Sequence, residues 1–351
     1  MNKLLFFAAA ATMFAACSTD TTICYTAIND KPISVHNING FGANIISNTY
    51  ENGIGKIVFD GNITTIPNYA FEDCVNLTNI TIPNNVTLIG KDAFKNCHSL
   101  INITIPNSVT SIEETAFWYC SNLKSVIIGD SVTSIGSYAF YGCSSLTAFH
   151  GKYASVDNRC LVKNGKLIVC APYGLTEYFI PSDVTSIGIY AFGDCRSLTN
   201  IIIPNSITSI EDGAFNNCSS LTAFYGKYAS ADNRCWVQDG RLVAFAPYGL
   251  TEYVIPDNVT SIVRYAFTDC RNLTNITIPD SVDLIGMYEF SDCSSLTSIY
   301  CKSIVPPALG YKAFIGISSS AKIYVPTVSV NAYKSAGNWS NFADKIAGYD
   351  F

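Results

Sequence analysis

The residues of this sequence best suited to chemistry are its cysteines. The chain of 351 residues contains 14 Cys and three His. Cys can act as a nucleophile, a redox group or a metal ligand, and each role needs partner residues at a suitable spacing. No C-x-x-C pair occurs, and eight of the Cys recur at one position of a repeating pattern. These eight are Cys74, Cys97, Cys120, Cys143, Cys195, Cys218, Cys270 and Cys293.

The spacing of these eight Cys argues against a metal site, because no His lies in phase with them. If the repeats stack as coils, the eight side chains lie about 5 Å apart in one column. Such a column is compatible with disulfides, which are common in exported proteins, or with a ladder of buried thiols. We favour the thiol ladder, because the position faces inward and each repeat closes without a bridge.

No other set of residues has the pattern of a catalytic site. His36, His98 and His150 fall in different parts of the chain, and the acidic residues are scattered singly. The sequence contains neither a phosphate-binding loop nor a nucleophile paired with a base. The formal charge of −6 comes without a basic stripe, which argues against nucleic acid as a partner. We therefore expect a protein that is not an enzyme and that carries no metal or cofactor.

The elements that position the Cys ladder form a repeated coil. A Phe lies three residues before each ladder Cys, and successive Phe are 23 residues apart, except for two steps of 52. A fixed period of this length is typical of a solenoid. Within one coil, Leu77–Ile82 has the alternation of a strand that Pro83 ends, and Val86–Ile89 is a second extended segment.

The end of each coil is predicted to bend and then to form a short helical turn. Gly90, like Gly136 and Gly188 in other coils, permits the bend. The run Ala-Phe-x-x-Cys follows, and the spacing of Phe94 and Cys97 places both on the inner side of one helical turn.

Two enlarged coils, at residues 146–174 and 221–249, account for the 52-residue steps. They match closely at an offset of 75 residues, which indicates a duplicated block. Asn164-Gly165 and Asp239-Gly240 predict a tight hairpin in each copy, and we expect these hairpins to project. The insertions are either tolerated surface loops or walls of a binding site.

The enlarged coils also contain irregular Cys. Cys160 and Cys170 are placed to pair across the first hairpin. In the second copy, Cys235 lies opposite Phe245, so this bridge is not a requirement of the enlarged coil.

The runs Leu-x-x-Ile-x-Ile-Pro, Val-Thr-x-Ile-Gly and Ala-Phe-x-x-Cys resemble the BspA-like leucine-rich repeats, over about residues 54–321. The resemblance implies an α/β-type repeat solenoid rich in β-structure. More specifically, it implies a right-handed leucine-rich-repeat arc with a concave parallel sheet, short helical turns and terminal caps. Because a solenoid needs atypical end units, we expect an N-terminal cap at 23–60, repeats at 61–321 and a C-terminal cap at 322–351.

The first residues have the pattern of an export signal. Residues 1–16 combine Lys3 with an apolar run, as in a bacterial signal peptide. Phe14–Cys17 resembles a lipobox, which implies cleavage before Cys17, acylation of that residue and a tether at residues 17–22. Ser18 after the Cys, by analogy with lipoprotein sorting, favours the outer membrane, whereas these residues do not decide whether the protein is exposed at the cell surface. An ordinary leader with an incidental Cys is the alternative.

Outward-facing residues of the predicted concave sheet are the candidate ligand-binding site. In the middle coils, apolar and aromatic residues replace the Thr found at the ends, and a contiguous exposed strip of this kind is typical of an interface. The residues are Ile127, His150, Phe179, Ile202, Tyr225, Val254 and Tyr300. They could instead pack under the hairpins.

The resemblance implies a cell-surface lipoprotein that adheres to host or microbial proteins. Membrane contact would be through the N-terminal lipid only. A glycan-binding surface protein, with the aromatic residues as stacking platforms, and a purely structural envelope protein are the alternatives.

Overall fold

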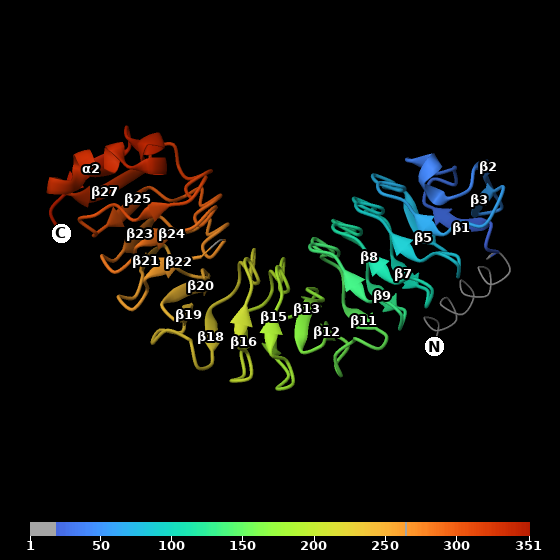
Figure 1. The fold of residues 1–351 in the computed structure, drawn as a ribbon, viewed down its shortest axis with the longest axis horizontal. Helices are drawn as coiled ribbons and strands as arrows, with labels where there is room; N and C mark the ends of the chain where they lie inside the picture. Colours follow the sequence, from blue (N-terminus) through green and yellow to red (C-terminus); the bar gives the residue numbers. More distant parts are fainter. Residues whose placement is uncertain (1–18, 264) are drawn as a thin grey trace. The chain divides into compact units, whose positions relative to one another are not determined.

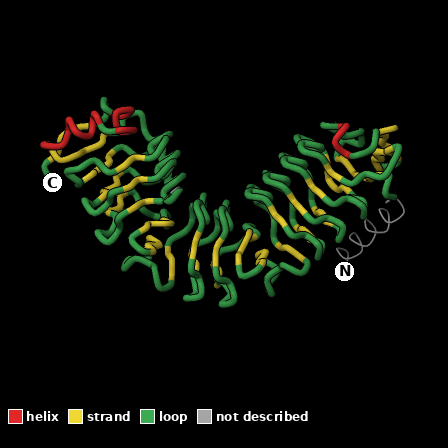
Figure 2. Tube along the Cα trace, in the orientation of Figure 1, coloured by secondary structure: helices red, strands yellow, loops and turns green. Residues whose placement is uncertain are grey.

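The computed structural model describes residues 19–263 and 265–351, which form two compact units (Figure 1). Unit 1 comprises the described residues up to Asn164 together with Ile168–Tyr173, and unit 2 comprises Gly165–Leu167 and Gly174–Phe351. Each unit is a β-solenoid of stacked coils with parallel sheets. Helix is limited to short segments, drawn in red in Figure 2.

The first strand of each coil lies in a row that we call the first face. In unit 1 these strands are β5 (Leu77–Ile80), β7 (Asn102–Ile105), β9 (Ser125–Ile128) and β11 (Ala148–His150). In unit 2 they are β14 (Glu177–Phe179), β16 (Asn200–Ile202), β18 (Ala223–Tyr225), β21 (Glu252–Val254), β23 (Asn275–Ile278), β25 (Ser298–Cys301), β27 (Lys322–Pro326) and β28 (Ile346–Tyr349). Neighbours such as β7 and β9 pair in parallel and in register. The inward Ile and Leu of each strand therefore stack on their equivalents in the next coil.

A second strand in each coil forms the second face. In unit 1 these strands are β4 (Thr65–Ile66), β6 (Leu88–Ile89), β8 (Ser111–Ile112) and β10 (Ser134–Ile135). In unit 2 they are β15 (Ser186–Ile187), β17 (Ser209–Ile210), β22 (Ser261–Ile262), β24 (Leu284–Ile285) and β26 (Ala308–Leu309). Pairing of β4 with β6, of β22 with β24 and of β24 with β26 is parallel.

The hairpins of the enlarged coils do not project, contrary to our expectation. In the second copy, β19 (Cys235–Gln238) turns through Asp239 and Gly240, both with positive φ, into β20 (Arg241–Phe245). β20 then pairs in parallel with β22 and so belongs to the second face. Its four apolar side chains, which include Leu242 and Phe245, are buried, because an apolar strand gains more from burial than from projecting into water.

The first enlarged coil repeats this arrangement. It contains β12 (Cys160–Lys163) and β13 (Lys166–Cys170). Within unit 2, Lys166 and Leu167 pair in parallel with the two residues of β15. Cys160 and Cys170 form a disulfide, as their positions across the hairpin had indicated. In the second copy, the Cys235 thiol instead lies 3.2 Å from the Tyr253 hydroxyl.

The Ala-Phe-x-x-Cys segments form a third row, the turn face, and the expected helical turn is wrong. Tyr69 and Asp73 have φ values of 63° and 60°, which are left-handed rather than helical. The Phe71 and Asp73 N–H groups donate to the Ala93 and Lys95 carbonyls of the next coil, at 2.8 and 2.9 Å. Since these donors bond between coils, they are not available for bonds along a helix. Each Ala-Phe-x-x-Cys segment therefore forms two successive turns instead of a helical turn.

Left-handed residues recur twice per coil on the turn face. The position before Cys is usually Asp, Asn or Gly, which adopt this conformation most easily. The position before Ala is often Tyr, although a bulky side chain pays about 1–2 kcal/mol there. Several of these Tyr lie against neighbouring rings, as Tyr265 does against Tyr288 with centroids 5.8 Å apart.

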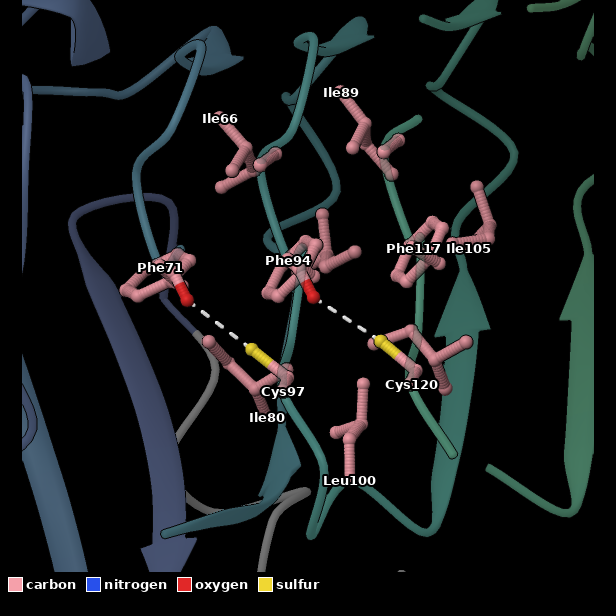
Figure 3. Packing of buried hydrophobic residues seen from close by; sticks show 14 of the residues in the cluster. Ile66, Phe71, Ile80, Ile89, Phe94, Cys97, Leu100, Ile105, Phe117 and Cys120 are labelled. Atoms are coloured by element: carbon pink, nitrogen blue, oxygen red, sulfur yellow. Dashed lines mark hydrogen bonds between the residues drawn. The ribbon is translucent and has the colours of Figure 1, made fainter. Parts of the chain in front are cut away.

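Stacked Phe and thiol hydrogen bonds fill the core behind the turn face (Figure 3). The rings of Phe94 and Phe117 are parallel within 4°, with centroids 5.0 Å apart. The Cys97 thiol donates to the Phe71 carbonyl at 3.1 Å, and the Cys120 thiol donates to the Phe94 carbonyl at the same distance. All eight ladder Cys are buried and have free thiols. A small apolar residue that is also a weak donor suits this position, because it fills the core and bonds a carbonyl of the previous coil.

Glycine at the end of the second strand serves close packing rather than a bend. Gly90 and Gly136 do not have positive φ. A Cβ at Gly136 would lie 2.3 Å from the Glu114 backbone nitrogen, and one at Gly90 would lie 2.6 Å from that of Asn68. The coil spacing therefore excludes a side chain here.

The ends of the chain fold differently from the coils. Near the amino terminus, β1 (Thr22–Ala27), β2 (Ile45–Glu51) and β3 (Ile54–Phe59) form an antiparallel sheet with a short 3-10 helix η1 (Ile38–Phe41), and β1 pairs antiparallel with β5. At the other end are η2 (Thr327–Ser329), α2 (Val330–Ser335) and η3 (Gly337–Phe342). Tyr333 and Trp339 from these helices are buried.

Within residues 19–263 and 265–351, no helix combines the length and hydropathy needed to cross a membrane.

We predict that Gly136→Ala lowers the free energy of unfolding by about 1–3 kcal/mol, because the added Cβ forces two coils apart. Urea denaturation measures this change. Gly61→Ala is the control, since its nearest neighbour would be 3.7 Å away and the substitution should be neutral or stabilise by up to about 1 kcal/mol. Equal effects of the two substitutions would contradict the packing argument.

The buried thiols predict a loss of stability at alkaline pH. Burial raises the pKa of Cys74 to about 12 and that of Cys97 well above its ordinary value of 9.0. The folded state thus keeps these protons above pH 9, where the unfolded state releases them, so stability falls as pH rises from about 9 towards 12. Above pH 9, we expect the free energy of unfolding to fall less steeply with pH in Cys97→Ala, by about 1.4 kcal/mol per pH unit.

Urea denaturation at a series of pH values from 8 to 11 measures the slope. Val109→Ala removes apolar volume from a buried position without removing a titrating group, so it should keep the full slope. An unchanged slope in Cys97→Ala would count against the proton linkage.

Candidate binding surface

The first face presents two of the candidate residues in unit 1. Ile127 and His150 lie at the same register position of β9 and β11, next to Thr104 of β7. Both side chains point away from the core and are exposed, in the case of Ile127 by 46%. Parallel in-register pairing is what brings them together, because it places equivalent residues of successive coils side by side.

Three more candidates form one patch in unit 2, which we call the β14–β18 patch. Phe179, Ile202 and Tyr225 occupy matching positions of β14, β16 and β18. Phe179 is 65% exposed and Tyr225 is also exposed, whereas Ile202 is half-buried between them. An exposed Phe and an exposed Tyr on either side of Ile202 make an apolar surface with one polar hydroxyl group.

The strip that we expected to be contiguous is interrupted within unit 2. The second enlarged coil covers the edge of β18, where the Phe224 N–H donates to the Asn233 carbonyl at 2.8 Å. β18 therefore ends one sheet, and β21 begins another. The last two candidates, Val254 and Tyr300, lie in this second sheet, on β21 and β25.

Tyr300 belongs to a group of four rings, which we call the aromatic cluster. Tyr324 stacks on Tyr300 with centroids 4.9 Å apart and planes within 16°. Tyr349 meets Tyr300 edge-on at 5.3 Å, and Phe351 lies 5.0 Å from Tyr349. Tyr349 and Phe351 are 43% and 51% exposed. Offset and edge-to-face pairs of this kind are favourable, so the cluster is a pre-formed aromatic surface.

A row of polar side chains runs beside the aromatic cluster on the same face. The pairing of β21, β23, β25 and β27 aligns Glu252, Asn275, Ser298 and Lys322. The Asn275 amide donates to the Glu252 carboxylate at 2.8 Å. The row lies two residues before the ring positions along each strand, which corresponds to about 7 Å. The surface therefore offers apolar rings, hydrogen-bond donors and acceptors side by side.

This arrangement is suited to binding rather than to bond-making chemistry. Aromatic rings contribute apolar contact area at little entropic cost, and the hydrogen-bonding groups of the polar row can orient a ligand. In the part of the chain that the structure describes, no three His, Cys, Asp or Glu are grouped as metal ligands.

Sequence reasoning missed Tyr324, Tyr349 and Phe351. Tyr324 could have been found, because it alternates with the buried Ile323 and Val325 in a recognisable strand. Tyr349 could not, because residues 346–349 add a last parallel strand, β28, within a segment that reads as a cap. Cys17, the predicted site of lipidation, lies outside the described residues.

Comparison with protein families identifies the repeats. The model of the BspA-type leucine-rich repeat region matches residues 44–165, 170–232 and 242–339. The chain belongs to this family. A comparison with curated protein sequences finds no significant match.

Bacterial leucine-rich repeat proteins are among the solved structures to which this chain is similar. A leucine-rich cell surface protein from Faecalibacterium prausnitzii A2-165 is 31% identical, with a TM-score of 0.47 over 63% of this chain and 58% of that one. A leucine-rich repeat protein from Bacteroides ovatus ATCC 8483 is 24% identical, with a TM-score of 0.35 over 82% of each chain. The chain thus spans 58% of the first relative's length.

Proposed function

We propose that this protein is a lipid-anchored surface protein that binds an extracellular protein through the aromatic cluster. The supporting observation is a group of four packed rings on one face, of which Tyr349 and Phe351 are exposed and Tyr300 and Tyr324 are half-buried. Exposed apolar patches on soluble proteins are commonly interaction sites, and Tyr is enriched among the residues that dominate binding energy.

The family and the first residues support the same proposal. Leucine-rich repeats present a broad surface of repeated strands, and the F. prausnitzii relative is described as a cell surface protein. The signal-like residues 1–16 and the lipobox-like Phe14–Cys17 would bring this chain to the outer membrane and anchor it there. Adhesion to host or microbial proteins is the role that follows.

Glycan binding is a second candidate, favoured by the polar row beside the rings. A sugar ring can stack its apolar face on a Tyr while its hydroxyl groups bond to neighbouring amide, carboxylate or ammonium groups. Asn275, Glu252 and Lys322 offer these groups on strands adjacent to Tyr300 and Tyr324.

Binding measurements with the fragment 18–351 test the aromatic cluster. We expect immobilised extracellular-matrix proteins to include a ligand for which Tyr300→Ala and Tyr349→Ala each weaken binding at least tenfold, about 1.4 kcal/mol. Tyr311→Ala is the control, because Tyr311 is also an exposed Tyr but lies outside the cluster.

The outcome separates the candidates. Binding that is unaffected by both cluster substitutions would exclude this surface. A glycan array that gives a ligand sensitive to the same substitutions, with no matrix protein bound, would replace protein adhesion by glycan recognition.

The lipid anchor is tested in cells with radiolabelled palmitate. We expect Cys17→Ser to lose the label and to leave the membrane fraction, because acyl chains supply the anchoring energy. Ser18→Ala should keep the label, since it retains the acylated residue. Label retained in Cys17→Ser would rule out this anchor.

A further inference from the structure

The turn face of unit 2 contains a gap at the second enlarged coil. Elsewhere, turn segments bond to the next coil: the Phe192 and Asp194 N–H groups donate to the Ala214 and Asn216 carbonyls, at 2.8 and 3.1 Å. The enlarged coil has no Ala-Phe-x-x-Cys segment. After β20, its chain runs directly through Pro247 to the next first-face strand.

The gap leaves two backbone donors without their usual acceptors. Phe215 and Asn217 occupy the positions whose N–H groups elsewhere donate to the next coil. Within residues 19–263 and 265–351, neither N–H group has a hydrogen-bond acceptor. Buried backbone N–H groups are almost always paired, with protein, water or ligand. Phe215 is buried and Asn217 is half-buried, so the acceptor for each N–H group comes from water or from a ligand.

A cavity lies beside these donors. Its inner part, about 20 Å³, is lined by residues that include Phe215, Asn217, Phe245 and Pro247. That volume accommodates about one water or one ligand oxygen. An outer cleft of about 200 Å³ shares Asn217 and Pro247 with the inner part and is large enough for a multi-atom group. We call the two parts together the turn-gap cleft.

Two arginines line the outer cleft, at equivalent positions of the duplicated block. Arg196 bonds to the Asp194 carboxylate through Nη2 at 3.1 Å, and Arg271 bonds to Asp269 in the same way at 2.9 Å. In both pairs Nε also points to the same carboxylate oxygen. The Asp side chains are largely covered, whereas the Arg side chains are 61% and 72% exposed. Each guanidinium is thus held along one edge, and its Nη1 group has no acceptor among the described residues.

We propose that the turn-gap cleft binds an oxyanion: a carboxylate, sulfate or phosphate group carried by an extracellular ligand. One oxygen would take the inner position and accept from the Phe215 and Asn217 N–H groups. The free edges of Arg196 and Arg271 would hold the remaining oxygens, because guanidinium groups match the geometry of oxyanions. Asp194 and Asp269 offset the arginine charges, so hydrogen-bond geometry contributes more to selectivity than net charge does.

The test is a titration of the fragment 18–351, labelled with ¹⁵N, with sodium sulfate, sodium phosphate and sodium glucuronate at constant ionic strength. The amide signals of Phe215 and Asn217 are expected to shift in a saturable manner with at least one of these anions, and not with chloride. Comparison of the three anions identifies the class of oxyanion. The absence of saturable shifts at both amides with all three would overturn the proposal and leave the cleft to water.

Variants test the arginines. We expect Arg196→Gln combined with Arg271→Gln to weaken binding at least tenfold. Arg241→Gln removes the same charge from an exposed position outside the cleft and should leave the affinity unchanged. If Arg241→Gln lost as much affinity as the double variant, the effect would be one of non-specific charge, and the proposal would be overturned.

Ser219→Phe provides a variant that keeps both arginines. Ser219 is exposed and lines both parts of the cleft, so the larger side chain should block entry without disturbing the core. Loss of binding with an unchanged melting temperature supports the cleft, whereas full binding would place the anion elsewhere.

Discussion

Hydrogen bonding from each coil to the next is the interaction on which the rest of the structure depends. The strands of both faces pair in parallel, and the turn segments add a third line of bonds, such as those from Phe71 to Ala93. A single coil has too little internal contact to offset the entropy of ordering its residues. Stacking supplies both the backbone partners and the burial of Phe and Cys columns, so each coil is stable only beside its neighbours.

The sequence predicted the coils well because a 23-residue period repeats both side chains and backbone requirements. Inward Leu and Ile, the Phe column and the buried position of Cys all follow from that period. The helical turn was wrong because a spacing of three residues, as from Phe94 to Cys97, also fits two consecutive turns. Only the bonds to the next coil distinguish the two cases. The role of Gly136 was also hidden, since a close approach between coils leaves no local sign.

The candidate surface was harder to predict, because it depends on where the sheet is interrupted. Alternation identified the outward positions of individual strands, including Tyr225 and Tyr300. It could not indicate that Asn233 covers the edge of β18 or that β28 brings Tyr349 beside Tyr300. Both contacts join segments outside the regular repeat, where the period carries no information. The second enlarged coil thus divides the aromatic surface on the first face of unit 2 and opens the cleft on its turn face.

The direction of the coil-to-coil bonds has a mechanical consequence. Within each unit, these bonds run along the stacking direction, so a pulling force along that direction acts on successive coils in series. A coil at the end of a stack has a neighbour on one side only and would detach first, releasing its residues as extended chain. In the proposed role of a link between a membrane and a ligand, such stepwise lengthening would absorb load while the remaining coils stay folded.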